Sequence, residues 1–259
     1  MAENLACLLK DMAPVSDADA EEFARSFLPD YHGPCVRIVI NSSDREYTVS
    51  KTLLCKESAY FAAMFESGFS EGETQSAILE AVDGVVSVQS FEGLLQWLYL
   101  GRVTFDSLNP EDRVSAIIEF TRLADMCSIT GMESQMAQNL KDIFVANPPP
   151  DFLIALNTCV NTNTRDITSQ HIASAANLPA EHPVRCMLAT ASVEGFLRNE
   201  NYKFAEETQN YPTFGADLLR EVRVVLRGLK IAHHHVTVED PISGRDIFIN
   251  NVINECGFC

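Results

Sequence analysis

The stretch that decides the fold is CVRIVINSSDREYTVSKTLLCKESAYFAAMFE, residues 35–66. From Val36 to Ile40, branched apolar residues alternate with others, which is the period-two pattern of a β-strand. A run of turn-forming residues follows, and a second strand is predicted over residues 45–49. The two strands and the short polar connection between them predict a β-hairpin.

The spacing of apolar residues changes to three or four directly after this hairpin. Ser50 can cap a helix, and the pattern up to residue 66 predicts two short helices broken near Ser58. A longer amphipathic helix is predicted after Ser87, and Gly101 is a residue type that ends helices. Short strands are expected before and after that helix, at residues 77–82 and 103–105.

Helices dominate the rest of the chain. Pro110 favours a helix start, because proline fits the first helical position, and another helix is expected over residues 132–144. The three prolines at 148–150 cannot continue a helix, so they predict a domain boundary. Beyond them, we expect helices at 152–159, 169–177, 183–196, 202–209 and 214–230, then a short strand at 236–238.

Four segments follow from this pattern. Residues 1–34 form an acidic segment, in which Phe23, Phe27 and Leu28 predict a short docked helix. An α+β domain is expected at 35–146, a helical extension at 151–232, and a short strand, turn and tail at 233–259.

The motifs of the first half resemble those of the BTB/POZ domain family, and they occur in the same order. The hairpin leads into Ser50-Lys51-Thr52-Leu53-Leu54, and a Ser-Ala-Tyr-Phe-Ala-Ala-Met-Phe helix starts at Ser58. The other similar pieces are Phe69–Gly72, Leu98–Gly101, Leu123–Met126 and Gly131–Glu133. The second half resembles the helical extension of single-BTB proteins abundant in fungi, at 170–172, 182–185 and 214–230. The resemblance implies a BTB/POZ fold followed by a mainly α-helical C-terminal region.

Two positions depart from the family pattern. The family often has an aspartate before the first strand and a histidine before the lysine of the first helix, whereas this chain has Pro34-Cys35 and Ser50 there. That aspartate belongs to a charged pocket in the transcription-factor branch. Its absence therefore weakens any transfer of co-repressor binding to this chain.

The resemblance implies a protein-interaction module that pairs with itself or another protein through its first helices. Six large apolar residues in that stretch exceed what one helical stripe buries, so some should remain exposed and favour a homodimer. Cover by the C-terminal helices or by residues 23–28 is the alternative. A cullin-based ubiquitin ligase, with this chain as substrate adaptor, is one expected setting, and a transcription or scaffold complex is another. The expected interface residues are Leu53, Leu54, Tyr60, Phe61, Met64 and Phe65.

The charge balance argues against several partners. With 19 Lys and Arg against 36 Asp and Glu, the formal net charge is -17, which repels nucleic-acid phosphates and anionic membranes. The chain has no apolar run near the roughly 20 residues of a membrane helix and no basic leader at its start. We therefore expect an intracellular protein, cytoplasmic or nuclear, without nucleic-acid or membrane partners.

No catalytic motif stands out. The sequence lacks a His-Glu-x-x-His pair and a phosphate-binding glycine loop, so we predict a non-enzyme without cofactor or bound metal. The alternative is a small redox or metal-binding protein that uses Cys256 and Cys259 with His233 and His235. A basic stripe on the predicted 214–230 helix could meet an acidic partner, be solvated, or balance nearby Asp and Glu, with the acidic N-terminal segment as an internal candidate. Its residues are Arg220, Arg223, Arg227 and Lys230.

Overall fold

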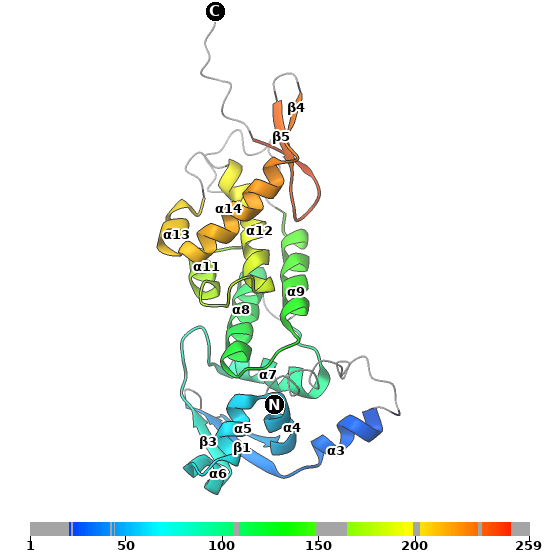
Figure 1. Cartoon of the computed structure of the whole chain (residues 1–259), viewed down its shortest axis with the longest axis vertical. Coiled ribbons are helices and arrows are strands. Elements are labelled where there is room, and N and C mark those ends of the chain that lie inside the picture. Colours follow the sequence, from blue (N-terminus) through cyan, green and yellow to red (C-terminus); the bar gives the residue numbers. More distant parts are fainter. Residues whose placement is uncertain are drawn as a thin grey trace, which may run out of the picture. The chain divides into compact units, whose positions relative to one another are not determined.

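The computed structural model describes residues 21–249, apart from 22, 42, 44, 106–108, 149–164, 199–202 and 233–234. The chain divides into two compact units, which are described separately. The first comprises residues up to Thr104 together with Arg122–Met132, and the second comprises Phe105–Thr121 together with the residues from Glu133 onward. Figure 1 shows the elements of both.

A three-stranded sheet forms one layer of the first unit, in the order β2-β1-β3. Strand β1 (Cys35–Ile40) pairs antiparallel with β2 (Arg45–Ser50) and parallel with β3 (Ser76–Leu79). Val36, Ile38 and Ile40 are buried, while the residues between them are exposed or half-buried. The predicted hairpin is therefore confirmed, and one face of it belongs to the core.

Helices pack against the buried side of this sheet (Figure 1). They are α4 (Lys51–Glu57), α5 (Ala59–Glu66) and α7 (Val88–Leu100), while α6 (Ser70–Thr74) has no buried residue and precedes β3. Ser50 and Ser58 each cap the helix that follows, by accepting from the backbone N–H of Leu53 at 3.3 Å and of Phe61 at 3.2 Å. Gly101 ends α7 in the left-handed conformation, with φ of 63°. The predicted helix starts and the break at Ser58 are confirmed.

Two details of the first half differ from the sequence prediction. The predicted strand at 103–105 is wrong: Val103 and Phe105 are buried but form no strand, because the N–H of Thr104 donates to the side chain of Gln96 at 3.0 Å. The predicted strand at 77–82 ends at Leu79, and Val82 forms an isolated bridge instead. A buried extended segment shows the same alternation as a strand, which explains the first error.

The predicted N-terminal helix is present as two short turns, η2 (Phe23–Phe27) and α3 (Leu28–Tyr31). Asp30 forms an ion pair with Lys56 at 2.7 Å, and the hydroxyl of Tyr31 donates to the carbonyl of Tyr99 at 2.7 Å. These contacts hold the turns against helices α4 and α7 of the same unit.

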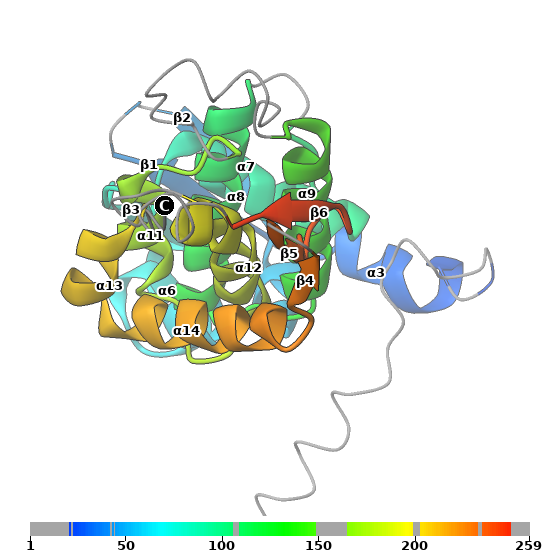
Figure 2. The same cartoon turned by 90° about the horizontal axis from the view of Figure 1, so that it is seen from above.

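Helices make up most of the second unit. Helix α12 packs against α9 and α14 (Figure 2). Its buried residues surround the helix rather than following one stripe, as expected for the central helix of a bundle. Helix α8 (Pro110–Met126) contributes residues to both units. The other helices are α9 (Glu133–Ala146), α11 (Ser169–Ala175), α12 (Pro183–Arg198), α13 (Ala205–Asn210) and α14 (Pro212–Leu226).

A second small sheet follows α14, in the order β4-β5-β6. Its strands are β4 (Lys230–Ala232), β5 (His235–Glu239) and β6 (Asp246–Phe248). The sequence predicted only the middle strand. The predicted helix at 214–230 ends at Leu226, so Lys230 lies in a strand instead.

The α+β class with a mainly helical C-terminal region is confirmed. The boundary expected at 148–150 stays a prediction, although α9 before it and α12 after it belong to one unit. The helix expected at 152–159 lies outside the described residues. Within the described part of the chain, no helix is long and apolar enough to cross a membrane.

Candidate protein-interaction surface

The exposed face of α5 is the best candidate for an interaction surface in the first unit. Ala59, Tyr60 and Ala63 are exposed, and Met64 is half-buried. Residues four apart lie on the same side of a helix, so the two alanines form a low ridge beside a higher one made of Tyr60 and Met64. This face is called the α5 surface below. Its two alanine side chains are small, which allows another helix to approach closely.

Most of the predicted interface residues do not belong to the α5 surface. Leu53, Leu54, Phe61 and Phe65 are all buried, at 3% exposure or less. The break at Ser58 gives two helices with separate apolar stripes, and both stripes face the core. The sequence prediction assumed a single stripe, so it underestimated how many of these side chains are buried. Only Tyr60, at 36% exposure, and Met64 are open to a partner. The interface itself stays a prediction.

Tyr60 has properties that suit an interface. Its ring packs edge-on against Phe61, with 5.2 Å between ring centroids, so the side chain is held in place. Partial burial raises the pKa of its phenol, which keeps the hydroxyl neutral and able to donate. An apolar ring with one polar end is a combination enriched in protein interfaces.

Part of α4 is covered by the N-terminal turns. Phe27 is buried, the ammonium of Lys56 lies 5.8 Å from its ring centroid, and the same ammonium pairs with Asp30. An aromatic series of Phe23, Phe27, Tyr31 and Tyr99 continues this contact. Residues 23–31 thus cover α4 within the chain, whereas the α5 surface remains exposed.

Of the two positions that depart from the family pattern, Ser50 is buried and bonded within the chain, whereas Pro34 and Cys35 are exposed. The hydroxyl of Ser50 donates to the carbonyl of Asp30 at 2.5 Å, and its N–H donates to the hydroxyl of Tyr99 at 2.9 Å. The ammonium of Lys51 donates to the carbonyl of Phe65 at 2.9 Å. The N–H and the hydroxyl of Ser50 are thus both bonded within the chain.

The second unit contains a Ser115–His171 pair that the sequence did not reveal. The Ser115 hydroxyl lies 2.7 Å from Nε2 of His171, while Nδ1 accepts from the N–H of Thr168 at 3.2 Å. A neutral imidazole whose Nδ1 accepts carries its proton on Nε2, so Nε2 donates to the serine. Burial lowers the pKa of His171 to about 4. In this state the histidine cannot take a proton from Ser115 as a general base.

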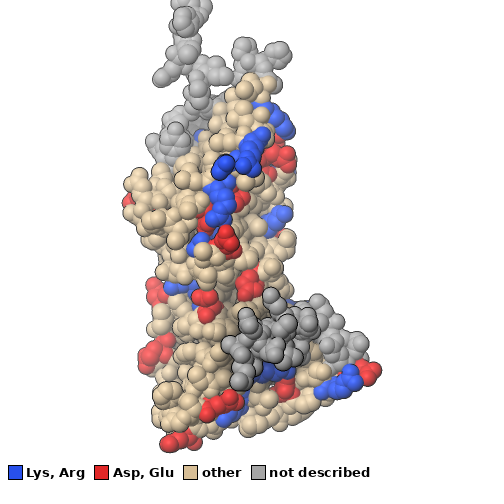
Figure 3. Space-filling model, in the orientation of Figure 1, with Lys and Arg blue, Asp and Glu red and all other residues tan. Residues whose placement is uncertain are grey.

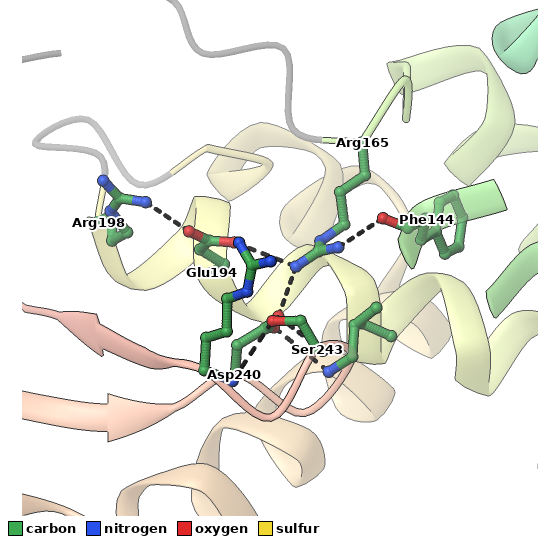
Figure 4. A network of polar contacts seen from close by, with 8 residues as sticks. Phe144, Arg165, Glu194, Arg198, Asp240 and Ser243 are labelled. Carbon is green, nitrogen blue, oxygen red and sulfur yellow. Dashed lines mark hydrogen bonds and ion pairs between the residues drawn. The ribbon is translucent and has the colours of Figure 1, made fainter. Parts of the chain in front are cut away.

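A buried cluster of charges lies near the C-terminal sheet (Figure 4). The guanidinium of Arg165 donates to the carbonyl of Phe144 at 2.7 Å, to Glu194 at 3.3 Å and to Asp240 at 2.5 Å. Glu194 also accepts from Arg198. This cluster joins the end of α9, helix α12 and the turn after β5, so its role is to hold those elements together.

A second buried pair connects α12 and α14. Arg185 donates to Asp217 at 2.6 Å and to the carbonyl of Leu178 at 2.9 Å, and Arg220 donates to the other oxygen of Asp217 at 3.0 Å. The sequence analysis assigned Arg220 to a basic stripe and did not find its buried partner. A carboxylate three residues before an arginine on a helix was the available signal.

The basic stripe is shorter than predicted. Arg220, Arg223 and Arg227 are exposed and follow α14, where Figure 3 shows a row of Lys and Arg atoms. Lys230 instead pairs with Asp246 across the small sheet at 2.7 Å. The stripe therefore ends at Arg227.

The redox and metal alternative falls mainly outside the described residues. Cys256, Cys259, His233 and His234 lie outside the described residues, and His235 is in β5 without a described side chain. Among the residues that are described, no group of three or more His, Cys, Asp or Glu could hold a metal ion.

A small sheet covered by helices, with further helices after it in the chain, defines an α+β domain. The model of the BTB/POZ domain family matches residues 34–143. The chain thus contains a BTB/POZ domain, a protein-interaction domain, and the resemblance inferred from the motifs is confirmed. The match includes α8 and α9, most of which belongs to the second unit. No curated protein matches the chain.

Proposed function

We propose that this chain is a protein-interaction module whose BTB/POZ domain joins two copies through the α5 surface. The carrying observation is that α5 exposes two alanines beside Tyr60 and Met64 while its other side is fully buried. Apolar surface of this kind is a recurrent mark of interfaces. A two-fold axis brings the α5 surface of one copy against the same surface of the other copy, which is the simplest way to cover it.

Light scattering across a concentration series tests this proposal. The full chain is expected to reach the mass of a dimer as its concentration rises into the micromolar range. The variant Tyr60→Glu/Met64→Glu places two charges in the contact and should remain monomeric. Ile78→Glu, at a position of β3 that is 65% exposed, is the matched control and should dimerise as the wild type does.

Two results would contradict the dimer. One is a wild-type chain that stays monomeric at high micromolar concentration, and the other is a double variant that dimerises like the wild type. The first would leave the α5 surface for a different protein, and the second would move the contact elsewhere.

We further propose a cullin scaffold as the partner, with this chain as substrate adaptor of a ubiquitin ligase. The support is the order of parts: a BTB/POZ domain comes first, and helices α12 and α14, which follow it in the chain, provide a further region for a substrate. Affinity purification of the full chain followed by identification of bound proteins is the test. Recovery of a cullin supports the adaptor role, whereas a transcription or scaffold complex without cullin refutes it.

We propose a cytoplasmic or nuclear location, supported by the net charge of -17, which disfavours anionic membrane surfaces. Cell fractionation tests it, and recovery with membranes would contradict it.

We also keep the division at residues 148–150 as a proposal. Limited proteolysis should cut there first, and because α9 packs against α12, the two fragments should still elute together under native conditions.

A further inference from the structure

The outer face of α14 combines arginines with exposed apolar residues in a way that solvation alone does not require. Leu219, Val224 and Leu226 are 59%, 55% and 41% exposed, although the opposite face of the helix is buried through Phe214 and Leu218. After the helix, Leu229 and Ile231 are exposed as well. A charged face that merely met water would more often carry polar residues at these positions.

Helix geometry gives this face a definite pattern. At about 100° per residue, Arg220, Arg223 and Arg227 lie within about 60° of one another. Leu219 and Leu226 lie about 80° to one side of this stripe, seven residues and therefore two turns apart. The result is a basic row with a parallel apolar row beside it, called the α14 surface below.

The arginines of the α14 surface are largely free to meet a partner. Arg220 is held by the buried Asp217, but Arg223 and Arg227 have no ion pair among the residues that the structure describes. Both lie in the last turn or at the end of α14, where a cation stabilises the helix dipole. That effect accounts for the arginines but leaves the exposed leucines without an explanation.

We propose that the α14 surface binds an acidic amphipathic helix of another protein. Leucines seven residues apart match the repeat of a helix that packs alongside, and acidic residues on that helix would complement the three arginines. A second copy of this chain is disfavoured, because a two-fold contact would set arginine against arginine. This surface lies on a different helix from the α5 surface, so the proposal does not rest on dimerisation.

The test uses the full chain and a fluorescein-labelled helical peptide of about three heptads. The peptide has leucine at every seventh position and glutamate on the adjoining positions, and a second peptide has the same composition in scrambled order. Fluorescence anisotropy should show binding of the ordered peptide, weakened by added salt, and at least about tenfold weaker binding of the scrambled one.

Charge-reversal variants locate the contact. Arg223→Glu/Arg227→Glu should weaken binding of the ordered peptide at least about tenfold, and Leu219→Ser/Leu226→Ser should weaken it by a similar factor. The control Arg102→Glu/Arg245→Glu makes the same change in net charge at two other exposed arginines and should bind as the wild type does. Tyr60→Glu/Met64→Glu should also bind normally, which separates this proposal from the dimer. Circular dichroism checks that each variant is folded.

Four outcomes would overturn the proposal. They are no binding of the ordered peptide, equal binding of the scrambled peptide, equal weakening by both charge-reversal pairs, and retained binding after Leu219→Ser/Leu226→Ser. Vesicles of anionic phospholipid serve as a further probe. Vesicle binding that Arg223→Glu/Arg227→Glu abolishes, without peptide binding, would assign the α14 surface to a membrane instead.

Discussion

The two compact units bury different kinds of polar side chains. In the described part of the first unit the buried polar residues are serines whose hydroxyls bond backbone groups. Ser50 and Ser58 cap helices, and Ser90 closes a turn by donating to the carbonyl of Val85. In the described part of the second unit the buried polar residues include full charges, namely Arg165, Arg185, Glu194, Asp217 and Asp240.

This difference has an energetic consequence. A buried hydroxyl that is satisfied by its neighbours adds a modest amount of stability, whereas a buried charge is tolerable only while its partner is present. Loss of one partner should therefore damage the second unit far more than loss of one cap damages the first. The unfolding of the two units can be measured separately, because the single tryptophan of the chain, Trp97, lies in the first unit.

The largest effect is expected from Arg165→Met. Removing the guanidinium leaves Asp240 buried without its cation and leaves Glu194 with Arg198 alone, and such a loss costs about 3 to 5 kcal/mol. Urea unfolding followed by circular dichroism, which reports helices of both units, should shift more than Trp97 fluorescence. The triple variant Arg165→Met/Glu194→Gln/Asp240→Asn removes the charges together and should regain part of the loss. Equal stability of Arg165→Met and wild type would show that the cluster does not hold the unit.

A somewhat smaller effect is expected from acidification. Burial lowers the pKa of His171 from 6.5 to about 4, so between these values the unfolded chain binds a proton that the folded chain does not. The contribution of this group to stability is therefore complete above pH 6.5 and is lost as the pH falls towards 4. The loss is about 3 kcal/mol at most, from about 1.4 kcal/mol per unit of pKa.

Thermal unfolding at a series of pH values checks this. His171→Gln should flatten the pH dependence between 6.5 and 4, whereas His32→Gln, at an exposed position, should leave it unchanged. An unaltered pH profile in the His171 variant would assign the effect to the carboxylates that titrate in the same range.

The third effect belongs to the first unit. Ser58→Ala removes the cap of α5 and also the donor to the buried carbonyl of Cys127, which it reaches at 2.6 Å. A lost cap and an unsatisfied carbonyl together cost about 2 kcal/mol. Trp97 fluorescence during urea unfolding measures it, with Ser134→Ala, an exposed serine of α9, as control. A cost as large as that of Arg165→Met would break the contrast between the units.

The same contrast explains which parts could be read from the sequence. The hairpin, the capped helices and the break at Ser58 follow from residues within a few positions of one another, so their patterns predict them. The Arg165 cluster joins side chains that are 29 and 75 residues apart in the sequence, and no local sequence pattern predicts such pairs. Tyr60 and Met64 were named among the interface residues, but the burial of Phe61 and Phe65 depends on how two helices meet the sheet.

Element ends were harder to predict where two signals competed. The apolar spacing of α14 continues to Leu229, yet the helix ends at Leu226 and Gly228 follows in a turn. Glycine costs about 1 kcal/mol in a helix interior, and the sequence contained that signal. Strands β4 and β6 have three residues each, too few for a period-two pattern to be recognised.

The smallest effect is expected at the surface of the first sheet. Arg37 and Glu46 form an ion pair at 2.6 Å across β1 and β2, but their side chains are 56% and 47% exposed. Water and salt screen such a pair, and holding two long side chains in place costs entropy, so its net contribution is small. Arg37→Gln, Glu46→Gln and the double variant should therefore unfold at the same urea concentration as the wild type, within error. A coupling between them as large as that between Arg165 and Asp240, measured by double-mutant cycles of Arg37→Gln with Glu46→Gln and of Arg165→Met with Asp240→Asn, would show that exposure is not what separates the two kinds of ion pair in this chain.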